Sequence, residues 1–402
     1  MQRHFVHNET NMYIDYTPSE IALRDELRAY FARLFTPALQ EELLHSEGGG
    51  PHYSTALKQM GKDGWLGIGW PKEYGGQDRT PLEQFIFFDE VQRAGFPIPL
   101  LTLNTVGPTI MKLGTPEQKA GFLPPILRGE LHFSIGYTEP EAGTDLASLK
   151  TKAVRDGDDY IIDGQKVFTS MAEHSDYIWL AARTDPSAAK HKGISIFIVD
   201  AQAPGVTISP TKTLGDNPVC TTYYEGVRVP AALRVGEENQ GWKLITTQLN
   251  HERVALMSAG LTARALEEVH EWASATTDSD GNRVIDRPWV QIALARVHAK
   301  LEILKLLNWR QASSIAQGRL LPAEASTVKV YGSEFYVEAY KLLLEILGPP
   351  GGLRAGSVGA IARGRLERLY RATLVLTFGG GTNEVQRDII AMGGMGIPRT
   401  PY

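Results

Sequence analysis

The sequence has a single cysteine, Cys220, among its 402 residues. One cysteine excludes an intrachain disulfide and a zinc site built from several thiolates. No apolar run approaches the roughly 18–20 residues that a membrane helix needs, and the first 20 residues lack the apolar core of a secretory signal. The formal net charge is -5, so no excess of basic residues indicates a nucleic-acid ligand. We therefore expect a soluble cytoplasmic protein that binds neither nucleic acid nor a membrane.

Several common catalytic signatures are also missing. The sequence contains no G-x-x-x-x-G-K-[ST] phosphate loop, no H-E-x-x-H zinc helix and no G-x-S-x-G nucleophile turn. Its glycine-rich runs, Gly348–Gly352 and Gly379–Thr382, do not open βαβ units, which argues against a Rossmann fold. We expect no metal site, and a cofactor-free hydrolase fits the sequence poorly.

The N-terminal part of the chain has the periodicity of helices. Thr17 to Glu20 form a capping-box pattern, and Leu23, Leu27 and Phe31 follow at helical spacing. We expect the Gly- and Pro-rich stretches Gly64–Gly76 and Ala94–Asn104 to be loops.

The periodicity then changes twice more. Between about residues 131 and 236, runs such as Ile194–Val199 are rich in β-branched residues and are divided by Asp-Gly and Pro-Gly turn signals. From about residue 239 the helical period returns, as in Leu294, Val297 and Leu301. We therefore predict an α+β fold: an N-terminal helical domain (1–130), a central antiparallel β-barrel-like domain (131–238) and a C-terminal four-helix bundle (239–402).

Three polar segments could carry chemistry. The loop Gly136–Asp145 combines two hydroxyls with Gly and Pro, and could bind a heterocycle edge or a phosphate. The strand Gly164–Ser170 could place an aromatic ring against a planar cofactor. The segment Phe378–Ile390 runs from three glycines into a helix whose N-terminus could hold an anion or a ring edge. Taken singly, a turn, ordinary strand packing and a helix cap explain the three segments equally well.

Together, the three segments resemble the acyl-CoA dehydrogenase family of flavoproteins in order and spacing. The matching motifs are T-E-P-x-A-G-[ST]-D at Thr138–Asp145, I-I-D-G-Q-K with its aromatic and hydroxyl at Ile161–Ser170, and G-T-N-E-x-Q-R at Gly381–Arg387. The resemblance covers nearly the whole chain. It implies the acyl-CoA dehydrogenase fold, with FAD bound between the β domain and the C-terminal helices.

The resemblance also implies which residues contact the cofactor. The residues expected to line the flavin and the start of the acyl-CoA site are Ile135, Tyr137, Thr138 and Thr144. Phe168 is expected to pack on the isoalloxazine ring, with Thr169 and Ser170 hydrogen-bonding its edge. The residues expected to approach from the C-terminal side are Thr382, Asn383 and Glu384.

The catalytic base departs from the common family pattern. Most members carry a glutamate directly before the final Gly-Thr, and this chain has Gly380 there. Some members keep their glutamate on a helix about 130 residues earlier, where this chain has Glu252 followed by Arg253. Glu252 is therefore the candidate base and Arg253 a candidate substrate contact, although an adjacent charged pair on a helix also explains them. Gly380 leaves room for a bulky or branched acyl group.

A second departure concerns the assembly. Many members have an R-x-x-F-G motif that reaches the FAD of a neighbouring subunit, and here only Arg283 could replace its arginine. Such drift resembles actinobacterial subunits, some of which form α2β2 assemblies on steroid or other bulky acyl-CoAs. We expect a homo-tetramer or homo-dimer, or an α2β2 hetero-tetramer.

The resemblance implies dehydrogenation of an acyl-CoA to a trans-2-enoyl-CoA, with electrons passing to an electron-transfer flavoprotein. Two alternatives stay open at this point. One is a flavin monooxygenase or oxidase on the same fold, and the other is a supporting subunit of a heteromeric dehydrogenase.

Overall fold

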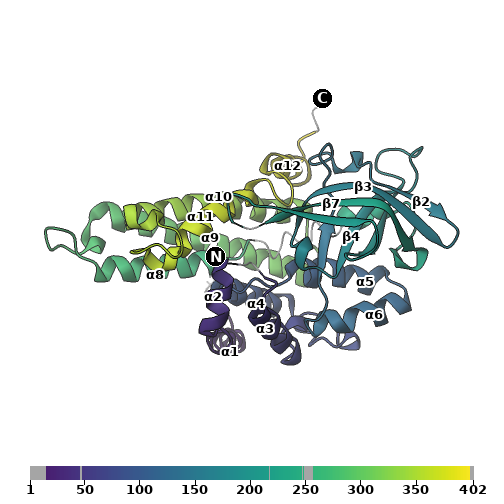
Figure 1. The fold of residues 1–402 in the computed structure, drawn as a ribbon. Helices are drawn as coiled ribbons and strands as arrows, with labels where there is room; N and C mark the ends of the chain where they lie inside the picture. The colour runs from purple at the N-terminus through teal and green to yellow at the C-terminus, as the bar shows by residue number, and fades with distance from the viewer. Residues whose placement is uncertain (1–14, 46–47, 217, 247, 249–256, 399–402) are drawn as a thin grey trace, which may run out of the picture.

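The chain folds in the order helices, strands, helices, which confirms the predicted fold class. The fold is that of a computed structural model, which describes residues 15–45, 48–216, 218–246, 248 and 257–398. Figure 1 shows the β domain at one end of the long C-terminal helices, with the N-terminal helices against both. The three parts therefore meet at one junction, where a site between them can form.

The N-terminal helices begin where the sequence supplies caps. The Thr17 side chain accepts a hydrogen bond from the Glu20 backbone N–H, and Leu23, Leu27 and Phe31 are buried, as the pattern predicts. The same capping box recurs at Thr80. The helices are α1 (Pro18–Leu34), α2 (Pro37–His45), α3 (Pro51–Lys62), α4 (Pro81–Ala94), α5 (Gly107–Leu113) and α6 (Pro116–Leu127).

One expected loop is partly helical. Gly64–Gly76 contains only short 3-10 turns, but Ala94–Asn104 becomes helical from Leu100 and continues as a π-helix at Thr102–Val106. Pro97 and Pro99 keep only the first part of the stretch non-helical, because proline disfavours helix at the residue before it. The expectation of a loop up to Asn104 is therefore wrong.

The β domain is one sheet in the order β6-β7-β3-β2-β4-β5-β8, with β1 beside β4. Most pairings are antiparallel, as predicted, but β1 and β2 pair with β4 in parallel. The strands are β1 (Phe133–Gly136), β2 (Lys152–Asp156), β3 (Asp159–Ser170), β4 (Tyr177–Arg183), β5 (Ile194–Asp200), β6 (Val206–Thr211), β7 (Val219–Pro230) and β8 (Arg234–Val235). β4 and β5 are almost wholly buried, so both faces of these strands are covered.

The C-terminal helices pack on one another lengthwise. Leu294, Val297 and Leu301 lie in their shared core, as the spacing predicts. The helices are α8 (Gly260–Ala275), α9 (Pro288–Ala316), α10 (Pro322–Leu347), α11 (Arg365–Thr373) and α12 (Asn383–Ile389). In the part of the chain that the structure describes, no helix combines the length and the apolar character needed to cross a membrane.

Helix α8 is capped by a side chain from α4. The Asp89 carboxylate accepts hydrogen bonds from Ser258 Oγ at 2.6 Å and from the Gly260 backbone N–H at 2.8 Å. A Cβ at Gly260 would lie 2.1 Å from the Asp89 carbonyl oxygen, so only glycine permits this approach. Burial raises the pKa of Asp89, and its hydrogen bonds only partly offset that effect.

We predict that Asp89 makes stability depend on pH. A carboxyl whose pKa is raised by folding binds its proton more tightly when folded, so its contribution falls as pH rises from about 4 through the raised pKa. D89N keeps an acceptor for Gly260 and removes the charge. Urea unfolding at about pH 5 and about pH 7.5 should show wild type losing more stability than D89N at the higher pH.

The matched control is D89A, which lacks both the charge and the capping acceptor and should be less stable than D89N by about 1 kcal/mol at both pH values. Equal pH dependence in wild type and D89N would contradict the prediction.

Candidate active site

The structure brings together two of the three predicted segments. The Val167 backbone N–H, near the end of β3, donates to the Thr138 carbonyl oxygen at 2.9 Å. Lys166 Nζ donates to the Tyr137 carbonyl oxygen at 3.0 Å. The loop after β1 is therefore fixed directly against the end of β3 that carries Phe168.

A buried ion pair holds this junction. Lys166 Nζ lies 2.8 Å from Glu139 Oε1, and both side chains are almost fully buried. Glu139 also accepts hydrogen bonds from the backbone N–H groups of Lys150 at 2.6 Å and Thr151 at 2.8 Å. Burial lowers the pKa of Lys166 to about 8, although Glu139 opposes that shift. The pair is charged at neutral pH, and its attraction fixes the loop because a buried charge needs a partner.

Phe168 has the geometry of a ligand-facing residue. The residue is 68% exposed, its φ is 58°, and it lies at an irregularity in the register between β3 and β7. A left-handed backbone is strained for an aromatic residue, and such strain concentrates at functional sites. The next residue, Thr169, is fully buried, and its Oγ1 has no hydrogen-bond partner among the described residues.

These residues fit a flavin. An outward-facing ring beside an unpartnered hydroxyl matches the packing and the edge hydrogen bond that a planar heterocycle needs. Ser170, expected at the same edge, is exposed at the end of β3. That these residues bind a cofactor stays a prediction.

Tyr137 connects the β domain to the helices. Its hydroxyl donates to Gln248 Oε1 and accepts from Trp179 Nε1 at 3.1 Å. Gln248 Nε2 in turn donates to Thr109 Oγ1, on α5, at 2.8 Å. The hydroxyl is therefore engaged inside the protein, and the Tyr137 side chain is buried.

The other loop residues are more accessible. Ile135 and Thr138 are half-buried, and Thr144 is exposed. Ile135 pairs with Trp179 across β1 and β4. Their contacts with a flavin or an acyl-CoA stay predictions.

The third segment is anchored on α10. Thr382 caps α12, and Asn383 is buried with its Oδ1 accepting from Lys329 Nζ at 2.7 Å. Lys329 Nζ also donates to the Gly381 carbonyl oxygen at 2.6 Å, so one lysine shapes the turn before α12. Glu384 is exposed in the first turn of α12. The approach of this segment to a cofactor stays a prediction.

The remaining predicted residues lie elsewhere. Glu252 and Arg253 lie outside the described residues. Arg283 lies in the turn between α8 and α9 and pairs with Asp286 at 2.8 Å. Figure 1 shows that turn at the end of the bundle away from the β domain, so a contact with a neighbouring subunit's cofactor stays a prediction. Within the described ranges, no group of three His, Cys, Asp or Glu side chains could hold a metal ion.

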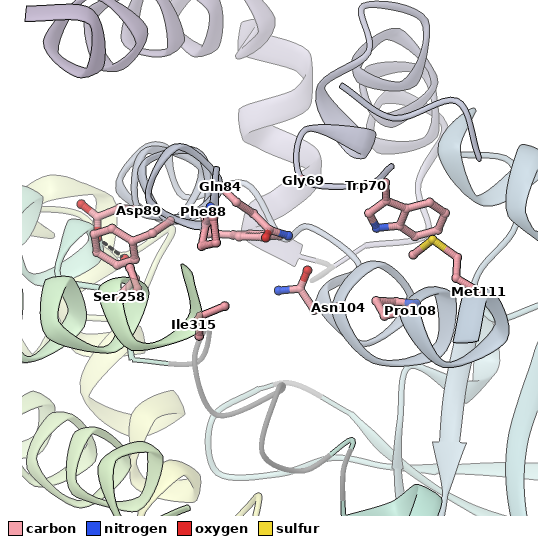
Figure 2. A pocket seen from close by; sticks show the side chains of 13 residues that line it. Gly69, Trp70, Gln84, Phe88, Asp89, Asn104, Pro108, Met111, Ser258 and Ile315 are labelled. Carbon is pink, nitrogen blue, oxygen red and sulfur yellow. Dashed lines mark hydrogen bonds between the residues drawn. The ribbon is translucent and has the colours of Figure 1, made fainter. Parts of the chain in front are cut away.

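A cavity of about 200 Å³ opens between α4, the turn at Gly69–Trp70, α5 and α9. Its walls are mostly apolar, and Figure 2 shows Asp89 with Ser258 at one end and Trp70 with Met111 at the other. The lining residues are Gly69, Trp70, Pro81, Gln84, Phe85, Phe88, Asp89, Asn104, Pro108, Met111, Ser258, Ala312 and Ile315. An apolar cavity with a few polar groups suits part of an acyl group.

Comparison with known proteins decides the family. Three profiles, for the N-terminal, middle and C-terminal domains of acyl-CoA dehydrogenase, match residues 17–130, 134–227 and 239–395. Acyl-CoA dehydrogenase FadE26 of Mycobacterium tuberculosis is 56% identical over 397 residues, which cover 96% of this chain and 99% of FadE26. The chain belongs to the acyl-CoA dehydrogenase family.

Other similar proteins support the same family assignment. Acyl-CoA dehydrogenase FadE29 of M. tuberculosis is 49% identical over 97% of this chain and 100% of its own. Among solved structures, a chain of the ChsE4-ChsE5 complex from M. tuberculosis is 57% identical with a TM-score of 0.91, covering 97% of this chain and 100% of that one. A chain of the Tcur3481-Tcur3483 steroid ACAD is 52% identical over the same shares of the two chains, also with a TM-score of 0.91.

Sequence reasoning missed the residues whose side chains hold the loops of the candidate site. Lys166 stands in the quoted motif but carries no sign that it is buried, because charged residues usually face solvent. Gln248 and Lys329 lie outside the three segments, and only the fold brings them to the loops they hold.

We predict that Phe168 stores strain for ligand binding. F168G should leave the protein without cofactor as stable as wild type, or more stable by about 1 kcal/mol, because glycine adopts this backbone without the left-handed cost. The same variant should bind FAD more weakly. Thermal unfolding and FAD titration check both effects.

The control is V154G, an exposed strand position outside the site, which should lose about 0.5–1 kcal/mol of stability and keep its FAD affinity. Unchanged FAD affinity in F168G would contradict the prediction.

We predict that the ion pair is essential to stability. K166M leaves the Glu139 carboxylate buried and unpaired, so the free energy of unfolding should fall by about 3–5 kcal/mol, and K166M/E139Q should recover part of the loss. The exposed pair Lys150–Glu141 supplies the control: K150M should change stability by at most about 1 kcal/mol. Denaturant unfolding measures all three, and equal losses in K166M and K150M would refute the account.

Proposed function

We propose that this chain is the FAD-binding, catalytic subunit of an acyl-CoA dehydrogenase that converts an acyl-CoA thioester to a trans-2-enoyl-CoA and passes electrons to an electron-transfer flavoprotein. The observation that carries the proposal is the strained, exposed Phe168 beside the unpartnered hydroxyl of Thr169. Both lie at the end of β3 that is fixed to the Tyr137–Glu139 loop. The family's cofactor needs a ring contact and an edge donor, and these two residues offer both.

In this proposal, Glu252 removes the α-proton. A thioester α-proton is weakly acidic, so the base must be oriented and partly desolvated, which raises its pKa toward the working pH. Ser258, six residues after Glu252 in the sequence, lines the cavity and is fixed by Asp89. Bound FAD supplies the acceptor for the hydride that leaves the β-carbon.

The usual base position supports this assignment. Gly380 has a φ of 68°, in the left-handed region. A glutamate there would adopt a conformation that costs about 1–2 kcal/mol for residues other than glycine. The absent side chain also leaves space beside the cofactor for a bulky acyl group.

We further propose a steroid-type acyl group and a heteromeric assembly. The similarity to a chain of the ChsE4-ChsE5 complex and to a chain of the Tcur3481-Tcur3483 steroid ACAD supports both. A homo-oligomer with one FAD per chain and full activity, measured by light scattering and absorbance, would contradict the heteromer.

We predict that acyl-CoA bleaches the flavin only when Glu252 is present. Anaerobic mixing of the FAD-loaded protein with a panel of straight-chain and steroid acyl-CoAs should bleach the flavin absorbance with at least one of them. In E252Q the rate should fall by about 10²–10⁴-fold, the usual contribution of a positioned base, with FAD still bound.

The matched control is E345Q, an exposed glutamate on α10, which should react like wild type. Equal rates in E252Q and wild type would overturn the role of Glu252. No bleaching with any thioester, together with fast reoxidation of reduced flavin by oxygen, would favour an oxidase or monooxygenase.

A further inference from the structure

Two polar side chains interrupt the apolar cavity between α4 and α5. In Figure 2, Gln84 and Asn104 point toward each other between the Asp89 end and the Trp70 end of the cavity. The side chains around them are largely apolar, including Phe88, Pro108 and Met111. In a cavity that takes only hydrocarbon, two amides would be costly to bury without partners.

The Asn104 amide lacks a protein partner at its oxygen. Its Oδ1 is buried and has no hydrogen bond among the residues that the structure describes. Unpaired buried polar atoms are rare in native proteins, and each needs a reason. Rotation of the amide about χ2 can present either its oxygen or its NH₂ group to the cavity, because this torsion is broad and roughly two-fold.

The backbone at Asn104 is itself unusual. Asn104 lies in the π-helix Thr102–Val106, directly before α5. Single π turns within helices are uncommon and are frequent at functional sites. At the end of this turn, a Cβ at Gly107 would lie 2.2 Å from the Trp70 ring, so the turn packs directly on the cavity wall.

Gln84 lies at a second close approach. A Cβ at Gly69 would lie 2.5 Å from Gln84 Cδ, so the missing side chain of Gly69 makes the space that the amide occupies. Glycines at 69 and 107 therefore allow the Gln84 amide and the Trp70 ring to lie where they do. Both glycines therefore shape the cavity wall that carries Gln84 and Asn104.

We propose that Gln84 and Asn104 are specificity-determining residues that hydrogen-bond a hydroxyl group carried by the acyl part of the substrate. The inference rests on the proposed dehydrogenase function and names the substrate class as hydroxylated acyl-CoAs. A hydroxyl suits the pair because it donates to an amide oxygen and accepts from an amide N–H at once. A site built to hydrogen-bond a hydroxyl rejects the analogue that lacks it, since its own polar groups are then left unpaired.

The test uses matched thioesters that differ only in a hydroxyl. The probes are octanoyl-CoA with its 5-, 6-, 7- and 8-hydroxy derivatives, and a steroid C24 acyl-CoA with its ring-hydroxylated derivatives. Anaerobic flavin reduction in wild type should favour one hydroxylated member of a series over its parent by at least about 10-fold. In N104L and Q84M that preference should fall to about 3-fold or less, and the parent thioester should reduce the flavin as fast as it does in wild type, or faster.

The control is M111L, an apolar change in the same cavity, which should alter both rates by one common factor. FAD absorbance and melting temperature show whether each variant is folded. If one of the two variants does not fold, the other still tests the inference. No preference in wild type, or a preference that survives both N104L and Q84M, would overturn the inference. Failure of every thioester to bleach wild-type flavin would instead overturn the proposed function, so the two failures are distinguishable.

Discussion

The buried pair of Lys166 and Glu139 is the interaction on which the rest of the site depends. The Lys166 ammonium donates to the Tyr137 carbonyl oxygen, and the Glu139 carboxylate accepts hydrogen bonds from two backbone N–H groups just before β2. The Lys166–Glu139 pair therefore contacts three segments: the loop after β1, the residues just before β2 and the end of β3. Since a buried charge is stable only with its partner in place, the pair restricts this junction to a single arrangement.

From that pair, contacts extend into the helices. Tyr137 contacts Gln248, and Gln248 contacts Thr109 on α5, the helix that follows the Asn104 turn. On the other side of the cavity, Asp89 fixes the start of α8, and Tyr336 donates to the Ser258 carbonyl oxygen. The cavity is thus bounded by elements that hydrogen bonds tie to one another, which suits a site that must orient a flexible chain.

Several residues that break local rules lie in the candidate segments and in the cavity wall. Phe168 has a left-handed backbone, the turn at Thr102–Val106 is π-helical, and Gly380 supplies a positive φ before α12. Sequences are expected to violate local preferences mainly at functional sites, where other interactions compensate. Here two buried lysines supply the compensating interactions. Lys166, two residues before Phe168, pairs with Glu139, and Lys329 donates to the Gly381 carbonyl oxygen.

Sequence reasoning predicted the order of helices and strands, because periodicity and caps are local signals. For example, Thr17 caps α1, and Leu294 and Val297 lie in the core of the C-terminal helices. Sequence reasoning also singled out Phe168 and Thr169 as candidate cofactor contacts, because their motif is contiguous, and that role stays a prediction. It missed the helix at Asn104, since the prolines before it resemble a loop, and it could not place Lys166, whose burial depends on tertiary packing. Asn104 and Gln84 lie 20 residues apart in the sequence, and no local pattern marks them as neighbours.

The most direct test of the account is a crystal structure of the protein with FAD and a non-reactive acyl-CoA analogue. The account predicts the isoalloxazine ring against Phe168, its edge within hydrogen-bond distance of Thr169 Oγ1, and the acyl group in the cavity between α4 and α5. A flavin bound elsewhere, with Phe168 still exposed and Thr169 Oγ1 still unpartnered, would contradict it.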